Sequence, residues 1–443
     1  ADVILTGCFL ALQQQLLQIG GGMMYHKLAS RVPQVARMRL SRAPRVPMSS
    51  SAASVSMYAG RADTSRLPTA KVSLPAIQTL NKAKPFSSGV EGNKFLTMLA
   101  SGKPIVCAEG YLFELEKRGY VQIGPFVPEV SLSHPEAVKQ LHREFVRAGS
   151  DVVQAFTYYA NRAKLRLIGK EDRLEALNRA ALRIAREVTE ETGTSLAGNV
   201  CNTTMYNPSD PETWEEVRLM FREQISWAAE EGAEFIIGET FSDYGEAVIA
   251  LEEIQRSGLP AVITFSLSNW TDGSKKGDQF MLQDGVTIVD ACRQIHAKGA
   301  KIVGLNCHRG PETIIPPLQA LRDAGCDFPL AALPVGYQCT ADKPTMQELS
   351  SPGKMYSDLD CHTATRYDFE AFGKECERLG IQYVGTCCGA AAHHVRALAM
   401  AVGKSPDSGA FVPDITKHFV YGKEEVLEDA GNLKGSFLSK SGS

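Results

Sequence analysis

The sequence of 443 residues lacks any apolar run of the roughly 18 to 20 residues that a membrane-spanning helix needs, so no membrane segment is expected. It also lacks the phosphate-binding motifs GxGxxG and GxxxxGK(S/T) after any predicted strand, which leaves a nucleotide-binding open sheet without support. Its 11 cysteines are an odd number without regular disulfide spacing. This pattern favours a reducing compartment, where clustered cysteines are more often metal ligands or catalytic thiols than disulfides.

Acidic residues are almost absent from the first 90 residues. This segment holds 11 Lys and Arg but only Asp2 and Asp63, a net charge of +9. The rest of the chain must then carry −12, because the whole chain carries −3. An acidic body argues against a nucleic-acid role, since phosphate binding requires a basic face.

The composition of residues 1–90 predicts a disordered, basic leader. Arg-rich, Ser-rich and acid-poor sequence is typical of an organelle transit peptide. We therefore expect a cytoplasmic protein, or a mitochondrial one if the leader is such a peptide. The first methionines are Met23 and Met24, so residues 1–22 are a candidate for translated upstream sequence.

From about residue 100 onward, short apolar or β-branched runs alternate with amphipathic helical patterns. Several of the helical stretches end in glycine, the usual stop signal of a helix. The clearest helical stretches are 135–149, 173–191, 213–232 and 285–299. The eight predicted strands are 104–110, 151–158, 195–202, 234–241, 260–267, 301–307, 329–335 and 382–388.

This alternation predicts a parallel sheet, because a strand–helix–strand unit pairs its strands in parallel through a right-handed crossover. Eight such units in about 300 residues predict a closed (β/α)₈ barrel of the TIM type over residues 91–405, followed by a C-terminal tail at 406–443. A doubly wound open sheet is the alternative. In a barrel the active site lies at the carboxyl ends of the strands. Those ends hold Cys107–Glu109, Tyr158–Tyr159, Cys201–Asn202, Glu239–Phe241, Asn306–His308 and Cys387–Cys388.

Two adjacent cysteines stand where the eighth predicted strand ends, in the sequence QYVGTCCGAAAHHV at 382–395. Neighbouring side chains on a regular strand point to opposite faces, but Gly389 permits a backbone turn that lets both sulfurs reach one point. With Cys307 from the sixth strand they make three thiols around one site, the composition of a catalytic zinc site with an open fourth position. Cys107 and Cys201 also lie near strand ends and compete with Cys307 on pattern alone.

A thiolate-bound zinc with an open position binds a substrate thiol and holds it as a nucleophile at neutral pH. The thiolate then attacks an electrophilic carbon such as an activated methyl group. Two alternatives are a redox pair formed by Cys387 and Cys388 and a non-catalytic zinc protein. The open position and the acids at the rim favour catalysis, because a structural site fills its fourth position with protein.

Two motifs in the sequence resemble the homocysteine S-methyltransferase family. They are NCHRGP at 306–311 and GTCCG at 385–389, at the ends of the sixth and eighth predicted strands. Each motif is specific to the family, and the two together at this separation are a strong indication of it. Within the family, the stretches 114–120, 134–160 and 364–368 look like the betaine-dependent branch. The resemblance covers roughly residues 95–405.

The resemblance implies zinc-dependent transfer of a methyl group from betaine to the sulfur of homocysteine, giving methionine and dimethylglycine. It implies one Zn²⁺ per chain, held by Cys307, Cys387 and Cys388. Tyr159 matches a tyrosine that occupies the fourth zinc position when homocysteine is absent and lies near the methyl donor. Glu239 matches an acid that holds the homocysteine ammonium.

The resemblance also implies an aromatic box that holds the trimethylammonium of betaine by cation–π attraction. Phe126 stands where the betaine enzymes have an aromatic residue, next to Tyr159 in that box, and core packing is the alternative for it. The first strand of the family commonly ends in Asp-Gly-Gly or Asp-Gly-Ala, and here the acid is Glu109, one position later. We expect Glu109, Gly110 and Asn306 to contact the substrate.

Two departures from the family pattern bear on the donor and the assembly. Thr240 follows Glu239 where the betaine enzymes have an aromatic residue, so S-methylmethionine or another sulfonium is an alternative donor. The tail after about residue 405 is short and lacks the aromatic, basic arm that those enzymes use in tetramer assembly. We expect a homo-oligomer of unspecified size, with homocysteine and betaine as small-molecule partners and neither nucleic acid nor membrane.

Overall fold

The computed structural model describes most of the chain from Gly92 onward. The predicted leader at 1–90 and Phe126 lie outside the described residues. Within the described ranges, no helix is both long and apolar enough to cross a bilayer. Those ranges are 92–122, 128–267, 275–276, 279–354, 356–414 and residue 416.

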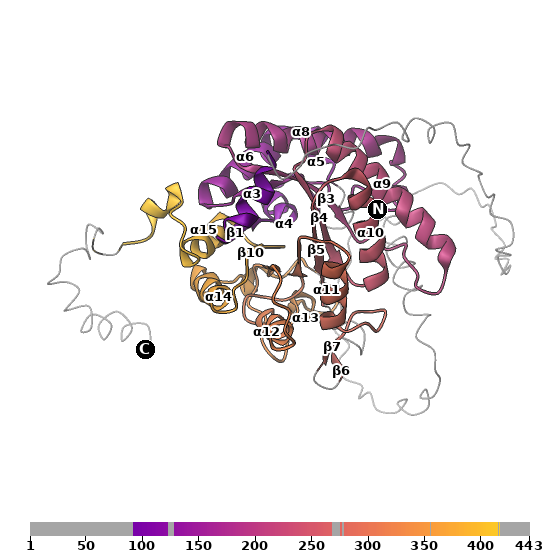
Figure 1. The fold of residues 1–443 in the computed structure, drawn as a ribbon. Coiled ribbons are helices and arrows are strands. Elements are labelled where there is room, and N and C mark those ends of the chain that lie inside the picture. The colour runs from indigo at the N-terminus through magenta and orange to yellow at the C-terminus, as the bar shows by residue number, and fades with distance from the viewer. Residues whose placement is uncertain are drawn as a thin grey trace, which may run out of the picture. The chain divides into compact units, whose positions relative to one another are not determined.

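Eight parallel strands close into a barrel, in the order β1-β10-β9-β8-β5-β4-β3-β2 (Figure 1). The strands of the barrel are Ile105–Ala108 (β1), Val152–Gln154 (β2), Ser195–Cys201 (β3), Phe235–Phe241 (β4), Ala261–Phe265 (β5), Ile302–Asn306 (β8), Leu330–Leu333 (β9) and Tyr383–Thr386 (β10). All eight predicted strands are present, and the (β/α)₈ barrel is confirmed over the open sheet. A two-stranded antiparallel pair, β6 (Lys275–Lys276) and β7 (Gln279–Phe280), lies outside the barrel.

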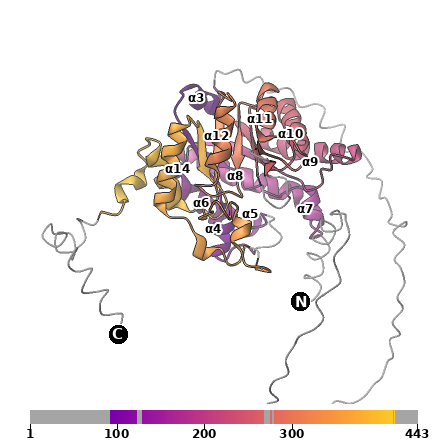
Figure 2. The same cartoon turned by 90° about the horizontal axis from the view of Figure 1, so that it is seen from below.

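Helices surround the strands and pack pairwise on one another around the outside (Figure 2). Their bounds are Lys94–Ala100 (α3), Tyr111–Lys117 (α4), Val130–Ser133 (α5), Pro135–Ala148 (α6), Arg162–Arg166 (α7), Leu174–Thr192 (α8), Pro211–Glu230 (α9), Tyr244–Ser257 (α10), Ile288–Ala297 (α11), Ile315–Asp323 (α12), Met346–Leu349 (α13), Arg366–Arg378 (α14) and Ala392–Ala401 (α15). The four predicted helices correspond to α6, α8, α9 and α11.

Capping side chains set where the predicted helices begin. The stretch predicted at 213–232 starts earlier, at Pro211, because the Asp210 side chain accepts a hydrogen bond from the Glu212 amide at 3.1 Å. The stretch predicted at 285–299 starts later, at Ile288, because the Thr287 side chain accepts one from the Asp290 amide at 3.0 Å. Helix boundaries therefore follow the caps rather than the apolar pattern.

The interior of the barrel is filled with side chains, so it is a packed core rather than a channel. Helix α3 covers the amino ends of the strands. Its Phe95 stacks on Phe235 of β4, with the ring centroids 3.8 Å apart and the planes inclined by 12°. Cys107 also lies in this interior cluster and is fully buried. The carboxyl ends of the strands therefore remain as the end of the barrel where polar residues gather.

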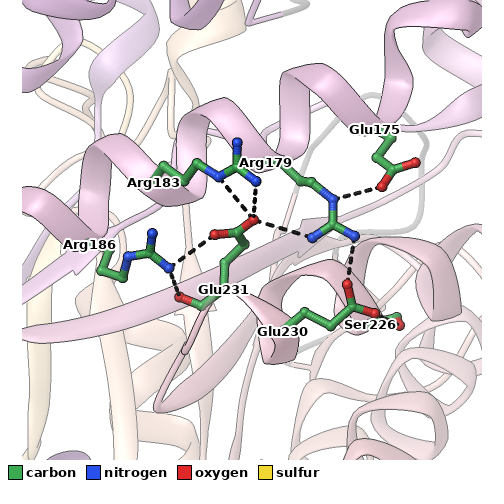
Figure 3. Close-up of polar contacts among 7 residues, drawn as sticks. All are labelled: Glu175, Arg179, Arg183, Arg186, Ser226, Glu230 and Glu231. Atoms are coloured by element: carbon green, nitrogen blue, oxygen red, sulfur yellow. Dashed lines mark hydrogen bonds and ion pairs between the residues drawn. The ribbon is translucent and has the colours of Figure 1, made fainter. Parts of the chain in front are cut away.

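An ion-pair network ties α8 to the end of α9 on the outside of the barrel (Figure 3). Three arginines of α8 reach the Glu231 carboxylate: Arg179 at 3.2 Å, Arg183 at 2.9 Å and Arg186 at 3.0 Å. The Glu231 side chain is 7 % exposed. Burial alone would raise the pKa of Glu231, but hydrogen bonds from Arg183 and Arg179 outweigh it and hold that pKa below its ordinary value.

Replacing Glu231 should weaken the fold in a pH-dependent way. We expect Glu231→Gln to lower the free energy of unfolding at pH 7 by about 2 kcal/mol, the scale of hydrogen bonds between charged groups. Because the folded-state pKa of Glu231 is lowered, its stabilisation is present above the ordinary glutamate pKa and is lost as pH falls through the folded-state value. Urea unfolding at pH 7 and in acid measures both effects.

Glu190→Gln is the matched control for this prediction. Glu190 also approaches Arg186, at 3.8 Å, but its side chain is 70 % exposed. Exposed pairs contribute little, so this variant should stay within about 0.5 kcal/mol of the wild type. Equal losses of unfolding free energy in the two variants would show that the buried Glu231 carboxylate stabilises the fold no more than the exposed Glu190 does.

Candidate active site

Three thiols from two strand ends converge at the carboxyl end of the barrel. Cys307 directly follows β8, and Cys387 and Cys388 directly follow β10, with β9 between the two strands. The Cys307 Sγ lies 3.6 Å from the Cys388 Sγ, and the two sulfurs of Cys387 and Cys388 are 4.0 Å apart. All three sulfurs lie within 4.8 Å of one another, and none forms a disulfide. The predicted convergence is confirmed.

The backbone makes this convergence possible by continuing the strand pairing and then turning sharply. The amides of Cys307 and Cys387 donate to Leu333 and Pro334 carbonyls at 2.9 and 2.8 Å, so β9 holds both cysteines. Gly389 then adopts φ 76°, and a Cβ at this position would collide with the Tyr337 ring. The predicted turn at Gly389 is therefore present, and only glycine fits it.

The spacing of the sulfurs fits a tetrahedral metal ion. Zn–S bonds of about 2.3 Å in tetrahedral geometry place two sulfurs about 3.8 Å apart, between the two measured separations. A disulfide would need about 2.05 Å. Hydrogen bonds from the Cys387 and Cys388 thiols lower the pKa of Cys307 well below its usual range, so one thiolate forms readily. Thiolates favour soft or borderline metal ions over magnesium or calcium.

The two competing cysteines do not belong to this cluster. Cys107 lies within β1 among the apolar side chains of the barrel interior, and burial raises its pKa well above the usual range. Cys201, the last residue of β3, accepts a hydrogen bond from the Tyr159 amide at 3.4 Å. Strand register, which the residue pattern does not specify, decides between the three candidates in favour of Cys307.

A buried carboxyl pair lies beside the thiols. Glu109 follows β1 and Glu239 belongs to β4, and a carboxylate oxygen of each lies within 4.8 Å of the Cys387 sulfur and of the other. Both are 3 % exposed. Burial raises the pKa of Glu239 to about 7, and burial followed by repulsion from Glu239 raises the pKa of Glu109 well above its usual range. Such a pair favours binding of a cation.

Side-chain amides fix the orientation of Glu239. Its Oε1 accepts hydrogen bonds from Gln154 at 2.8 Å and from Asn199 at 2.7 Å, and its Oε2 accepts one from Asn306 at 2.9 Å. Sequence reasoning missed Gln154 and Asn199. The available signal was a polar side chain within a strand that is buried on both sides, because such a group needs a buried partner.

Glu109 contrasts with its neighbour. Neither of its carboxylate oxygens has a hydrogen-bond partner among the residues that the structure describes. A buried polar group without a partner is costly, so Glu109, beside the Glu239 carboxyl, is suited to receive a cationic group. Gly110, the next residue, has φ 122°, and a Cβ there would lie 2.7 Å from the Cys387 carbonyl oxygen. Gly110 thus allows β1 and the cysteine turn to approach each other.

Asn306 links the acids to the thiols. Its Nδ2 donates to Glu239 Oε2 and, at 2.8 Å, to Thr240 Oγ1, and it lies 3.9 Å from the Cys387 sulfur. Its Oδ1 accepts from the Thr240 amide and the Thr264 hydroxyl, both at 2.9 Å. Both the nitrogen and the oxygen of the Asn306 side-chain amide therefore have hydrogen-bond partners within the protein. Asn306 thus serves to position Glu239.

Tyr159 lies in the loop between β2 and α7, five residues beyond Gln154. Burial chiefly raises the pKa of its phenol, and the nearby Cys201 and Cys307 add to this effect. Its ring centroid is 4.3 Å from that of Tyr158. Phe126, the other predicted wall of the box, lies outside the described residues.

Four non-glycine residues at this rim adopt left-handed backbone angles. Tyr159, Thr240, Cys307 and His308 have φ between 54° and 60°. This conformation is uncommon for residues with a side chain and rare for a β-branched one such as Thr240. Such outliers cluster at functional sites, where the surrounding structure holds them in place.

Comparison with known proteins agrees with this geometry. The family model for homocysteine S-methyltransferase matches residues 110–402. The chain belongs to this family. As a member, it is an enzyme that transfers a methyl group to homocysteine, and the resemblance carried by the NC and GTCCG motifs is confirmed.

Homocysteine methyltransferases of both donor types are similar to this chain. Betaine–homocysteine S-methyltransferase 1 of Bos taurus is 36 % identical over 335 residues, which cover 74 % of this chain and 78 % of that protein. The S-methylmethionine–homocysteine S-methyltransferase BHMT2 of Rattus norvegicus is 34 % identical over 331 residues, which cover 74 % and 85 %. The metallated homocysteine methyltransferase MmuM from Escherichia coli shares the fold, with a TM-score of 0.54 at 19 % identity over 69 % of this chain and 98 % of its own.

Removing one thiol of the cluster should abolish tight metal binding. We expect Cys307→Ser and Cys388→Ser to bind metal at least about tenfold more weakly, since even residues outside the ligand shell change affinity by roughly 10- to 100-fold. Elemental analysis after dialysis identifies and counts the bound metal. Cys361→Ser, at an exposed cysteine outside the cluster, is the control and should retain the wild-type content. Full occupancy in both cluster variants would contradict the ligand assignment.

Proposed function

We propose that this enzyme transfers a methyl group from betaine to the sulfur of homocysteine, using one Zn²⁺ per chain, and releases methionine and dimethylglycine. The observation that carries the proposal is the convergence of three thiols beside a buried carboxyl pair. Three thiolates with an open fourth position suit a catalytic zinc ion. When bound, zinc would supply a homocysteine thiolate at neutral pH. Cys307, Cys387 and Cys388 would hold it.

The carboxyl pair would receive the ammonium of homocysteine. Homocysteine carries its thiol and its ammonium on one short chain, and the thiol cluster and the carboxyl pair share Cys387. Glu239, oriented by three amides, would fix the direction of the ammonium, and Glu109 would gain a cationic partner. Placing the sulfur in one position in this way contributes to the rate by alignment.

The aromatic face of Tyr159 would hold the trimethylammonium of betaine by cation–π attraction, with Phe126 as the second proposed wall. The donor methyl would then approach the homocysteine sulfur in line. Dimethylglycine leaves as a neutral amine with its lone pair, so the departing nitrogen requires no acid. The chain's main contributions are therefore binding and alignment.

S-methylmethionine is the second candidate donor. Thr240 supports S-methylmethionine as the donor. The betaine enzymes have an aromatic residue at this position, which would strengthen a box for the trimethylammonium of betaine, and this chain lacks it. The Thr240 hydroxyl accepts from Asn306 instead, which commits this side chain to positioning the acid. A non-catalytic barrel has less support, since Glu109, buried and without a hydrogen-bond partner among the described residues, has no role in one.

We further propose a homo-oligomer built from the barrel of residues 91–405, with a leader at 1–90 and a tail at 406–443. A cytoplasmic location is proposed, with mitochondria as the alternative. Light scattering of the purified protein measures the oligomer. The mass of the protein from its native source reports whether the leader is removed.

Methionine formation from homocysteine by zinc-loaded protein separates the two donors. We expect turnover with betaine and at least about tenfold lower kcat/KM with S-methylmethionine, the scale of one lost favourable contact. The two donors are supplied separately, with a zinc-free sample as the control. Turnover with S-methylmethionine alone would overturn the donor assignment.

The proposed ammonium site predicts a substrate-specific effect. Glu239→Gln removes the charge and keeps the shape, so the KM of homocysteine should rise by about 10- to 100-fold, as expected for a lost hydrogen bond between charged groups. The KM of betaine should change less than twofold. Glu252→Gln, at an exposed surface glutamate, is the control. If only the KM of betaine rose, Glu239 would belong to the donor pocket instead.

A further inference from the structure

A lysine that has no anionic partner among the described residues lies beside the proposed donor pocket. Lys164 belongs to the short helix α7, which follows β2, and its Nζ lies 4.3 Å from the centroid of the Tyr159 ring. The Asn161 side chain accepts a hydrogen bond from the Lys164 amide at 2.9 Å, so the start of α7 fixes the position of this lysine. Sequence reasoning did not single it out.

Lys164 is partly buried, and within the described part of the chain its ammonium has no hydrogen-bond acceptor and no carboxylate within ion-pair distance. Burial lowers its pKa. Other lysines of the same region pair with carboxylates, namely Lys94, Lys139, Lys170, Lys374 and Lys404. A partly desolvated ammonium is unfavourable without a counter-ion, and an aromatic ring compensates only part of that cost. The site is therefore prepared for an anion.

The ionisable groups near Lys164 are Cys201 and Glu246, and a negative charge on Glu246 favours the protonated lysine. Within the described residues neither group lies within hydrogen-bonding or ion-pair distance of the ammonium. The Glu246 Oε1 accepts hydrogen bonds from the Thr203 amide and hydroxyl at 2.7 and 2.6 Å, and Cys201 accepts one from the Tyr159 amide. Burial raises the pKa of Cys201 above its usual range, so this thiol stays neutral.

We propose that Lys164 binds the carboxylate of the methyl donor, and that it thereby selects a donor whose carboxylate lies one carbon from the methylated cation. This inference rests on the proposed function. Lys164 and the trimethylammonium would both lie near the Tyr159 ring. The betaine carboxylate, placed between them, offsets the repulsion of the two cations and forms a charge-assisted hydrogen bond with the lysine.

The same arrangement disfavours other donors. Choline carries the same trimethylammonium but has a neutral hydroxymethyl group in place of the carboxylate, so its cation would meet a lysine charge that no anion offsets. In S-methylmethionine three carbons separate the sulfonium from the carboxylate, and an ammonium lies next to that carboxylate. Lys164 would therefore repel a cation where betaine presents an anion.

The carboxylate of homocysteine is the other carboxylate that Lys164 could bind. It is attached to the carbon that bears the ammonium, so it lies near the acids that receive the ammonium. Glu239 is hydrogen-bonded to Gln154, Asn199 and Asn306, whereas the Lys164 ammonium lies over the Tyr159 ring. The donor carboxylate is therefore favoured, and separate kinetics for the two substrates distinguish the two sources.

Lys164→Met keeps most of the length of the unbranched side chain and removes its charge. We expect the KM of betaine to rise about 10- to 100-fold, the range for losing a hydrogen bond between charged groups, while the KM of homocysteine stays within twofold. Choline, tested as a competitive inhibitor, should bind the variant as well as or better than the wild type, because a like charge has gone. A general structural defect would weaken both ligands. Lys164→Arg should recover part of the betaine affinity.

Lys139→Met is the matched control, since this lysine pairs with Glu187 and Glu191 on the outer surface. It should leave both KM values unchanged. An unchanged KM for betaine in Lys164→Met, or a rise confined to homocysteine, would overturn the inference. Absence of wild-type turnover with betaine would instead overturn the proposed function itself, together with the inference that rests on it.

Discussion

The parallel register of β8, β9 and β10 is the constraint on which the candidate site depends. Both cysteine segments donate their amides to consecutive carbonyls at the end of β9, which places Cys307 and Cys387 at the same height on the rim. A slip of one residue in either strand would turn a thiol from the barrel mouth toward the helices. The positions of Glu109 and Glu239 at the barrel mouth depend in the same way on the register of β1 and β4.

Charge is distributed unevenly around this mouth. Carboxyl groups and thiols line one side, and the ammonium of Lys164 lies beside Tyr159 on another. The proposed substrates, homocysteine and betaine, are both zwitterions, so each would need a cationic and an anionic partner within a small, poorly hydrated space. Fixed protein charges that complement both molecules would orient them before any bond changes. The amides around Glu239 serve this purpose by holding the acid still.

Much of this architecture was predictable from the sequence, for identifiable reasons. The strands are short, continuous apolar runs bounded by glycine and polar residues, as expected for a parallel sheet buried on both faces. The gathering of thiols at one rim was predictable because barrel topology brings strand ends together, but only the family resemblance favoured Cys307 over Cys107 and Cys201. The partners of Glu239 were not predictable, because Gln154, Asn199 and Asn306 come from three strands far apart in the chain. Helix starts such as Pro211 and Ile288 depended on single capping side chains.

The left-handed residues at the rim have a consequence for how the protein can evolve. Each such conformation costs roughly 1 kcal/mol or more, against a typical total stability of about 5–15 kcal/mol. Four of them at one mouth use a sizeable part of the margin that separates a folded enzyme from an unfolded one. Destabilising substitutions at the amino ends of the strands, around Phe95 and far from any substrate, are therefore tolerated less because the rim already uses part of the stability. Selection for activity at one end of the barrel then restricts sequence variation at the other.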